Sequence, residues 1–310
     1  MSRSSRDGRR ERGWPPVPEP LPAAVVDNHT HFPVGAADDP GVREGTQPLT
    51  VAEHIERAVA VGVDRMVQVG CDLDTLEGSI ALAETHPQVV AAIGIHPNEA
   101  PLHAGVREVA PDGLDPAVAP RHETSLDDAV ARVAELARHP RVRAIGETGL
   151  DFFRGGEQAR QVQRQAFRAH IALAKELDLP LQIHDRDAHE DVVEVLLADG
   201  APDRTVFHCF SGGVELARVC AEHGWYLSVA GPITFKANDP LRAAVREVPA
   251  ELLLVETDAP YLTPVPYRGR PNAPYLLPLT VERLATEIGL DVTELCHRLS
   301  ATTEAVYGAW

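Results

Sequence analysis

Eight short apolar runs, each about as long as a β-strand, recur along this chain of 310 residues. The runs cover residues 23–27, 65–71, 89–96, 142–147, 181–184, 205–208, 226–229 and 252–258. Segments with the apolar spacing of helices lie among them, at residues 51–61, 126–137, 158–177, 192–197, 214–223 and 281–288. Apolar strands that alternate with helices are typical of a parallel sheet covered by helices. Eight such units predict an α/β fold, a (β/α)8 or TIM barrel.

Two segments fall outside this alternation. Residues 1–22 are rich in Arg, Ser and Pro, and the prolines disfavour both helix and strand pairing. We expect a disordered or surface-draped extension there, followed by a single barrel domain over residues 23–310. Residues 98–125 follow the third run and show little periodicity. They form either a loop at the mouth of the barrel or a tolerated surface insertion.

Composition narrows the classes of protein to which the chain can belong. The formal net charge of −17 repels polyanions at long range, so a nucleic-acid substrate would need a local positive site such as bound metal. No run approaches the roughly 18 apolar residues of a membrane span, so no membrane association is expected. The four cysteines lie far apart with no Cys-x-x-Cys pair, which argues against a zinc–thiolate cluster and favours a reducing, cytoplasmic location.

Six of the eight apolar runs end in side chains that can bind a metal ion. In chain order these are His29 with His31, then His96, Glu147, His184, His208 and Asp258. In a barrel the carboxyl ends of the strands converge on one face. The period of two along a strand turns His29 and His31 to the same side. Imidazoles and carboxylates together are typical ligands of Zn²⁺, Mn²⁺ or a similar divalent ion.

Longer motifs surround these side chains. They read Asp27-x-His29-x-His31, Gly94-Ile95-His96-Pro97, Gly146-Glu147-Thr148-Gly149-Leu150-Asp151, His208-Cys209-Phe210-Ser211-Gly212 and Glu256-Thr257-Asp258-Ala259-Pro260-Tyr261-Leu262. Arg268-Gly269-Arg270-Pro271-Asn272 and Ala273-Pro274-Tyr275 follow. From about Val25 to the C-terminus the chain resembles the TatD family, metal-dependent deoxyribonucleases of the amidohydrolase-like barrel superfamily.

The resemblance implies two divalent ions per chain, Mg²⁺, Mn²⁺ or Zn²⁺, and no other cofactor. One ion would be held by His29, His31, Glu147 and Asp258, and the second by Glu147, His184 and His208, so that Glu147 bridges the two. We expect Asp258 to act also as the general base on the attacking water. His96 is implied to lie near the ions, where it either contacts phosphate, donates to the leaving group, or only packs.

Other side chains are candidates for supporting roles. We expect Asp27 and Glu256 to orient ligand imidazoles by hydrogen bonds. Arg186, Lys236 and Tyr261 are the candidates for substrate binding, with Asp151 as a further one. A guanidinium suits a phosphate oxygen, although Arg186 could equally form an ordinary salt bridge. Tyr261 and Tyr275 either stack on a base at the mouth or pack against the protein.

The expected function is hydrolysis of phosphodiester bonds of DNA by hydroxide bound at a binuclear metal site. The resemblance implies a 3′-to-5′ exonuclease; we expect it to act on DNA ends, mainly single-stranded, as a monomer. The alternative is hydrolysis of a carbonyl substrate (an amide, ester, lactone or aminoacyl bond) on the same barrel. Glu147 stands where many barrel amidohydrolases carry a carbamylated Lys, which favours the nuclease. A scaffold without activity is a third possibility, and the complete ligand set argues against it.

Glu304 departs from the family pattern, in which an Asn is expected.

Overall fold

The structure is a computed structural model that describes residues 13–34 and 46–309. Its eight strands form one parallel sheet in sequence order. They are β1 (Val25–Thr30), β2 (Val63–Gly70), β3 (Val89–Ile93), β4 (Val142–Asp151), β5 (Leu181–Arg186), β6 (Thr205–Phe207), β7 (Tyr226–Val229) and β8 (Leu253–Val255). A parallel bridge between Thr30 and Ala259 joins the two edges of the sheet. The predicted TIM barrel is confirmed.

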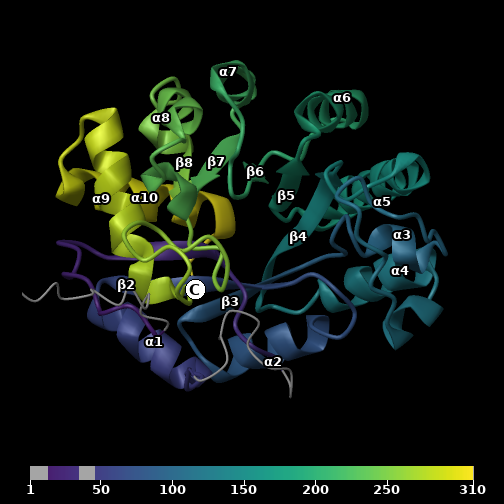
Figure 1. Cartoon of the computed structure of the whole chain (residues 1–310), viewed down its shortest axis with the longest axis horizontal. Coiled ribbons are helices and arrows are strands. Elements are labelled where there is room, and N and C mark those ends of the chain that lie inside the picture. The colour runs from purple at the N-terminus through teal and green to yellow at the C-terminus, as the bar shows by residue number, and fades with distance from the viewer. Residues whose placement is uncertain (1–12, 35–45, 310) are drawn as a thin grey trace, which may run out of the picture.

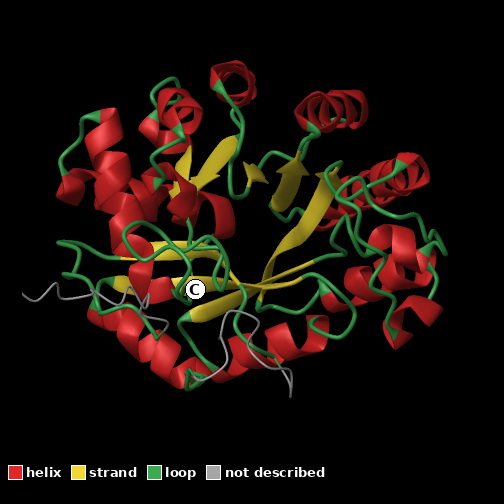
Figure 2. Cartoon of the chain, in the orientation of Figure 1, coloured by secondary structure: helices red, strands yellow, loops and turns green. Residues whose placement is uncertain are grey.

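Helices surround the strands on the outside, as Figures 1 and 2 show. They are α1 (Val51–Ala60), α2 (Leu76–Thr85), α3 (Ala100–His103), α4 (Leu126–Leu136), α5 (Glu157–Leu177), α6 (His189–Asp199), α7 (Val214–His223), α8 (Asp239–Val245), α9 (Leu277–Ile288) and α10 (Val292–Tyr307). Within the two described ranges, no helix is long and apolar enough to cross a membrane.

The observed elements differ from the predicted ones mainly at their ends. Strands β1, β4 and β5 run past their predicted ends and carry His29, Glu147 and His184 within the sheet. The apolar spacing indicates neither α2 nor α8. Helix α2 has the polar Ser79 among its buried residues and the apolar Ala81 on its exposed side, so its sequence shows no clear apolar stripe, and α8 has only 7 residues.

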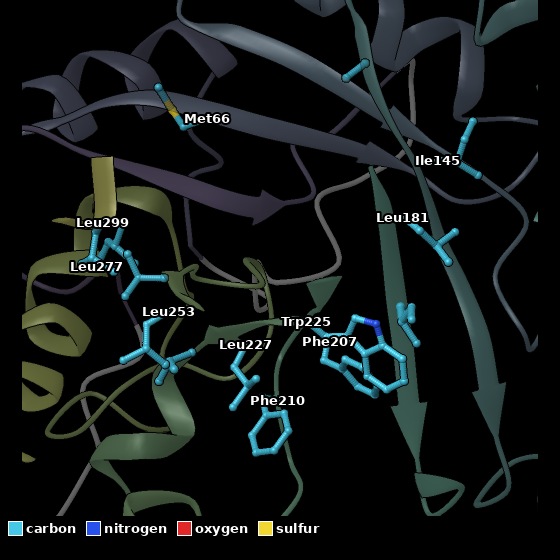
Figure 3. Packing of buried hydrophobic residues seen from close by; sticks show 14 of the residues in the cluster. Met66, Ile145, Leu181, Phe207, Phe210, Trp225, Leu227, Leu253, Leu277 and Leu299 are labelled. Atoms are coloured by element: carbon cyan, nitrogen blue, oxygen red, sulfur yellow. The ribbon is translucent and has the colours of Figure 1, made fainter. Parts of the chain in front are cut away.

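The apolar core has two layers, one on each side of the sheet. The outer layer fills the space between strands and helices, where Figure 3 shows Met66, Leu181 and Phe207. The inner layer fills the barrel and consists of Val67, Val69, Val90, Ala92, Ala144, Val206, Leu254, Val306 and Tyr307. The last two come from the end of α10, where the Val306 carbonyl accepts a bond from Arg204, just before β6. Helix α10 therefore packs at the amino ends of the strands and leaves their carboxyl ends open.

The segment before β1 lies against the barrel where the structure describes it. The Trp14 indole donates to the Gln47 carbonyl at 2.9 Å, and the Tyr275 hydroxyl donates to the Pro15 carbonyl at 2.8 Å. Residues 13–22 contain no helix or strand. The expectation for residues 1–12 lies outside the described residues, so the division into extension and barrel stays a prediction.

His54 of α1 leads to a prediction on stability. Its ring lies between Trp14 and Phe32, and neither ring nitrogen has a hydrogen-bond partner among the residues that the structure describes. Burial lowers the pKa of His54 to about 4, whereas an unfolded histidine has a pKa of about 6.5. The unfolded chain therefore binds the proton more readily, and stability present above pH ~6.5 is lost as the pH falls toward ~4.

We expect His54→Leu to reduce the loss of unfolding free energy between pH 7 and pH 4.5 by about 2 kcal/mol, measured by urea unfolding. His223→Leu, at an exposed histidine, is the control and should keep the wild-type pH dependence. An unchanged pH dependence in His54→Leu would contradict this account.

Candidate metal centre

The polar side chains at the carboxyl ends of the strands meet in one cavity of about 890 Å³. Five of the expected metal ligands line it together with His96; the five are His31, Glu147, His184, His208 and Asp258. His29 lies beneath them and is fully buried. The structure thus brings together six expected metal ligands and His96, from six strand ends.

Glu147 lies at the centre of this group, and its two carboxylate oxygens face different imidazoles. Oε1 is 2.6 Å from His184 Nδ1 and 2.8 Å from His208 Nε2. Oε2 is 3.6 Å from His29 Nε2 and 3.9 Å from His31 Nε2. One carboxylate therefore lies between two separate pairs of imidazole nitrogens.

Asp258 faces the pair of imidazoles formed by His29 and His31. Its Oδ1 is 3.6 Å from His31 Nε2 and 3.9 Å from His29 Nε2. Asp258 adopts a φ of 52°, a left-handed conformation that is unusual for a residue other than glycine. Its backbone N–H donates to the His29 carbonyl at 2.9 Å, which fixes this conformation against β1.

Close contact between β4 and β5 positions Glu147 and His184. Gly149 has a φ of 141°, and a β-carbon there would lie 2.1 Å from the His184 carbonyl oxygen. Only glycine allows this approach. The two strands can then place their side chains within hydrogen-bonding distance of each other.

The outer nitrogen of each of the four imidazoles faces an oxygen. The pairs are His29 Nδ1 with Gln182 Oε1 at 3.1 Å, His31 Nδ1 with the Val69 carbonyl at 3.2 Å, His184 Nε2 with Asp151 Oδ2 at 3.2 Å, and His208 Nδ1 with Glu256 Oε1 at 3.1 Å. Each outer nitrogen therefore donates its hydrogen, and each inner nitrogen of the neutral ring presents a lone pair to the cluster.

These lone pairs test whether the site suits a cation. The inner nitrogens of His29 and His31 are only 3.1 Å apart. Two lone pairs at that distance repel each other unless a cation or a proton lies with them. Neutral imidazoles with hydrogen-bonded outer nitrogens, beside shared carboxylates, are the arrangement that divalent metal ions require. The residues therefore fit the metal ions that the resemblance implies.

The pKa shifts in the site show that metal ions would displace protons. Burial disfavours charge on His184, yet the carboxylates of Asp151 and Glu147 raise its pKa to about 9. Burial likewise opposes ionisation of Glu147, but the neighbouring His208 and His96 hold its pKa well below the usual range. Protons on the imidazoles therefore compensate the carboxylates when no cation does, and metal binding must release them.

His96 is oriented differently from the other imidazoles. Its Nδ1 accepts a hydrogen bond from the Asn98 backbone N–H at 3.0 Å. The neutral ring must then carry its proton on Nε2, which is 3.4 Å from Glu147 Oε1. In this tautomer His96 presents a hydrogen to the cavity, although its ring also lies with Glu147 and His184 in a group that could hold a metal ion.

The three expected substrate contacts lie in different places. Tyr261 is 53% exposed, lines the cavity and faces the His31 ring. Arg186 also lines the cavity, with its guanidinium 3.8 Å from the centre of the Phe153 ring. Among the described residues, Lys236 is not part of the cavity lining: it is exposed beyond η2 (Gly231–Thr234).

One expectation from the sequence is wrong, and one alternative that the sequence left open is decided. Asp27 orients no imidazole, since its carboxylate accepts bonds from the Thr257 backbone and hydroxyl and from the His29 backbone. Burial raises its pKa to about 7. Tyr275 cannot stack on a base because it is fully buried beneath the segment that contains Pro15. Both residues connect parts of the chain that are distant in sequence.

Sequence reasoning also missed two residues near the site. Gln182 lies in the middle of an apolar run, where nothing singles it out. Arg154 lines the cavity, and its Nε is 3.3 Å from Asp112 Oδ2 of the long segment 98–125. Glu304, which departs from the family pattern, forms an ion pair with Arg65 at 3.1 Å on the surface.

A further group, Glu99, His103 and His122, has the composition of a metal site but not its hydrogen bonding. His122 Nδ1 accepts from the Ala119 N–H at 2.8 Å, so its Nε2 carries the proton and donates to Glu99. Arg121 donates to both oxygens of the same carboxylate. The group is a hydrogen-bonded clamp within segment 98–125.

Comparisons with known proteins agree with this geometry. The family model described as TatD related DNase matches residues 26–308. A protein of Mycobacterium tuberculosis named as uncharacterized metal-dependent hydrolase TatD is 40% identical over 92% of this chain and 98% of its own length. A Salmonella typhimurium protein named as 3′-5′ ssDNA/RNA exonuclease TatD is 31% identical over 82% of this chain and 91% of its own. The crystal structure of the TatD homologue YjjV from Escherichia coli K12 has a TM-score of 0.76 at 26% identity and covers 92% of this chain and 98% of that one. This chain belongs to the TatD-related DNase family.

Proposed function

We propose that this metal-dependent hydrolase is a nuclease that removes nucleotides from the 3′ end of single-stranded nucleic acid, with two divalent ions at the Glu147 cluster. The observation that carries the proposal is the position of the Glu147 carboxylate between two pairs of imidazoles. The 3′-to-5′ direction and the single-stranded substrate rest on the similarity to the Salmonella relative, which is named as a 3′-5′ ssDNA/RNA exonuclease.

Each ion would have its own set of ligands, with Glu147 in common. His29, His31 and Asp258 would hold the first ion, and His184 and His208 the second. Mixed nitrogen and oxygen ligands suit Zn²⁺ or Mn²⁺, and Mg²⁺ with more water. When bound, the two ions would supply Lewis acidity and positive charge to a phosphodiester.

Two side chains of the site have the protonation states that hydrolysis needs. Burial opposes ionisation of Asp258, but its hydrogen bond with His31 and the other imidazoles keep its pKa below the usual value. Its carboxylate is therefore ionised and can accept a proton from attacking water. His96 carries its proton on Nε2, where it can pass to the leaving oxygen.

The rim of the cavity suits a polyanion better than the net charge of −17 suggests. Arg154 and Arg186 both line it and can each contact phosphate oxygens. Tyr261 has an exposed ring that can stack on a base, which a single strand makes accessible. We propose that the enzyme acts as a monomer, and in the cytoplasm, where its four free cysteines would stay reduced.

The shared carboxylate gives the most direct test of function. With Mn²⁺ present, we expect the wild-type protein to shorten 5′-labelled single-stranded DNA from its 3′ end. The resulting ladder should disappear when the 3′ end is blocked and when EDTA is added. Glu147→Gln should lower this rate by more than about 100-fold, because it removes the charge between the two ion positions.

Glu304→Gln makes the same chemical change at an exposed glutamate of α10 and should leave the rate unchanged. If wild-type protein binds two ions yet leaves DNA and RNA intact, the nuclease proposal fails. Ester, lactone and amide substrates would then be tested on the same site.

His96 gives a second prediction, which separates proton transfer from metal binding. Since His96 is not needed as a ligand, His96→Gln should keep both ions in metal analysis. Loss of its proton should lower turnover by about 10²- to 10⁴-fold. The effect should shrink with a substrate whose leaving group needs no protonation, such as a p-nitrophenyl phosphodiester. Loss of one ion in His96→Gln would show instead that His96 is a ligand.

A further inference from the structure

Gln182 is a polar side chain within the apolar interior of the barrel. It is fully buried, and its neighbours Leu181 and Ile183 belong to the outer layer. In the sheet it pairs with Val206, a member of the inner layer. Gln182 therefore points into the barrel, where an amide is costly unless its polar atoms are all hydrogen-bonded.

The hydrogen bonds of Gln182 satisfy the whole amide. Its nitrogen donates to the Asn28 carbonyl at 2.9 Å and to the Tyr307 hydroxyl at 2.8 Å. Its oxygen is 3.1 Å from His29 Nδ1. The Asn28 carbonyl can only accept, so the amide nitrogen must face it, and the amide oxygen must face His29. His29 must then carry its hydrogen on Nδ1.

Tyr307 extends these hydrogen bonds to the amino ends of the strands, where α10 packs. It is the last residue of α10, is only 2% exposed, and packs within the inner layer. The neighbouring Thr303 hydroxyl lies 3.1 Å from Asn28 Oδ1, so α10 contacts β1 through a second polar pair. A polar path thus runs through the barrel from the C-terminal helix to an expected metal ligand.

We propose that Gln182, held by Tyr307, is a positioning residue that fixes His29 in the Nδ1–H tautomer. This tautomer presents the lone pair of Nε2 beside His31 and Asp258. The amide acts through His29 and touches neither ion nor substrate. The inference rests on the metal-binding part of the proposed function and not on the identity of the substrate.

The test uses the full-length chain and two readouts that do not depend on activity. The first is Zn²⁺ binding by titration calorimetry. The second is the His29 tautomer in ion-free protein, from long-range ¹H–¹⁵N correlations of labelled histidine. The variants are Gln182→Met, which keeps the length of the side chain without its hydrogen bonds, and Tyr307→Phe, which removes one hydroxyl.

Gln182→Met should weaken one of the two Zn²⁺ sites by about 10- to 100-fold and leave His29 as a mixture of tautomers. Tyr307→Phe should change both readouts in the same direction by a smaller amount. Ser228→Ala is the control, at an inward position of β7 that pairs with Leu254. It removes a hydroxyl that has no partner within the described part of the chain, and it should change neither readout.

A Gln182→Met variant with wild-type affinities and the Nδ1–H tautomer would overturn the inference. If that variant does not fold, the test uses Tyr307→Phe instead. An unchanged His29 tautomer and unchanged Zn²⁺ affinities in Tyr307→Phe would overturn the inference. If the wild-type protein binds no Zn²⁺, the metal-binding part of the proposed function fails, while the tautomer in ion-free protein still tests the role of Gln182.

Discussion

The carboxylate of Glu147, buried among four imidazoles, is the contact on which the rest of the site depends. Its Oε1 lies 2.6 Å from His184 Nδ1, while its Oε2 faces His29 and His31. A buried charge is strongly destabilising without such partners, and these come from β1, β5 and the residue after β6. No single stretch of chain supplies them, so the sheet must curl until its first and fifth strands face each other. The closed barrel is therefore a condition for the chemistry and not only its support.

Oxygen atoms behind the imidazoles determine what those rings can do. Each outer nitrogen donates to a carbonyl, amide or carboxylate oxygen, which leaves the inner nitrogens free to coordinate. His96 shows the opposite case, because a backbone N–H at its Nδ1 keeps the proton on Nε2. The same residue type thus presents a lone pair or a hydrogen to the cavity according to one hydrogen bond. Residue type alone does not separate these roles, whereas hydrogen bonding does.

The barrel and the clustering of the candidate ligand side chains could be predicted from the sequence, because both are encoded locally. An apolar run followed by His or Glu indicates a buried strand with a polar end. This pattern can be recognised without knowing which strands lie beside it. The sequence predicts the role of Asp27 wrongly and cannot decide between stacking and packing for Tyr275, because their partners, Thr257 and Pro15, are more than two hundred residues away in sequence. Gln182 gives no signal for a similar reason: its role depends on the end of α10. Helix α2 is missed because a buried Ser79 and an exposed Ala81 blur its apolar stripe.

The proposed function depends on one carboxylate that is shared by two ions. A crystal structure of the Mn²⁺-loaded protein, with anomalous differences collected at the manganese edge, would locate both ions. We expect two anomalous peaks, one beside His29, His31 and Asp258 and the other beside His184 and His208, with Glu147 in contact with both. A single peak, or two peaks of which one does not contact Glu147, would contradict this proposal.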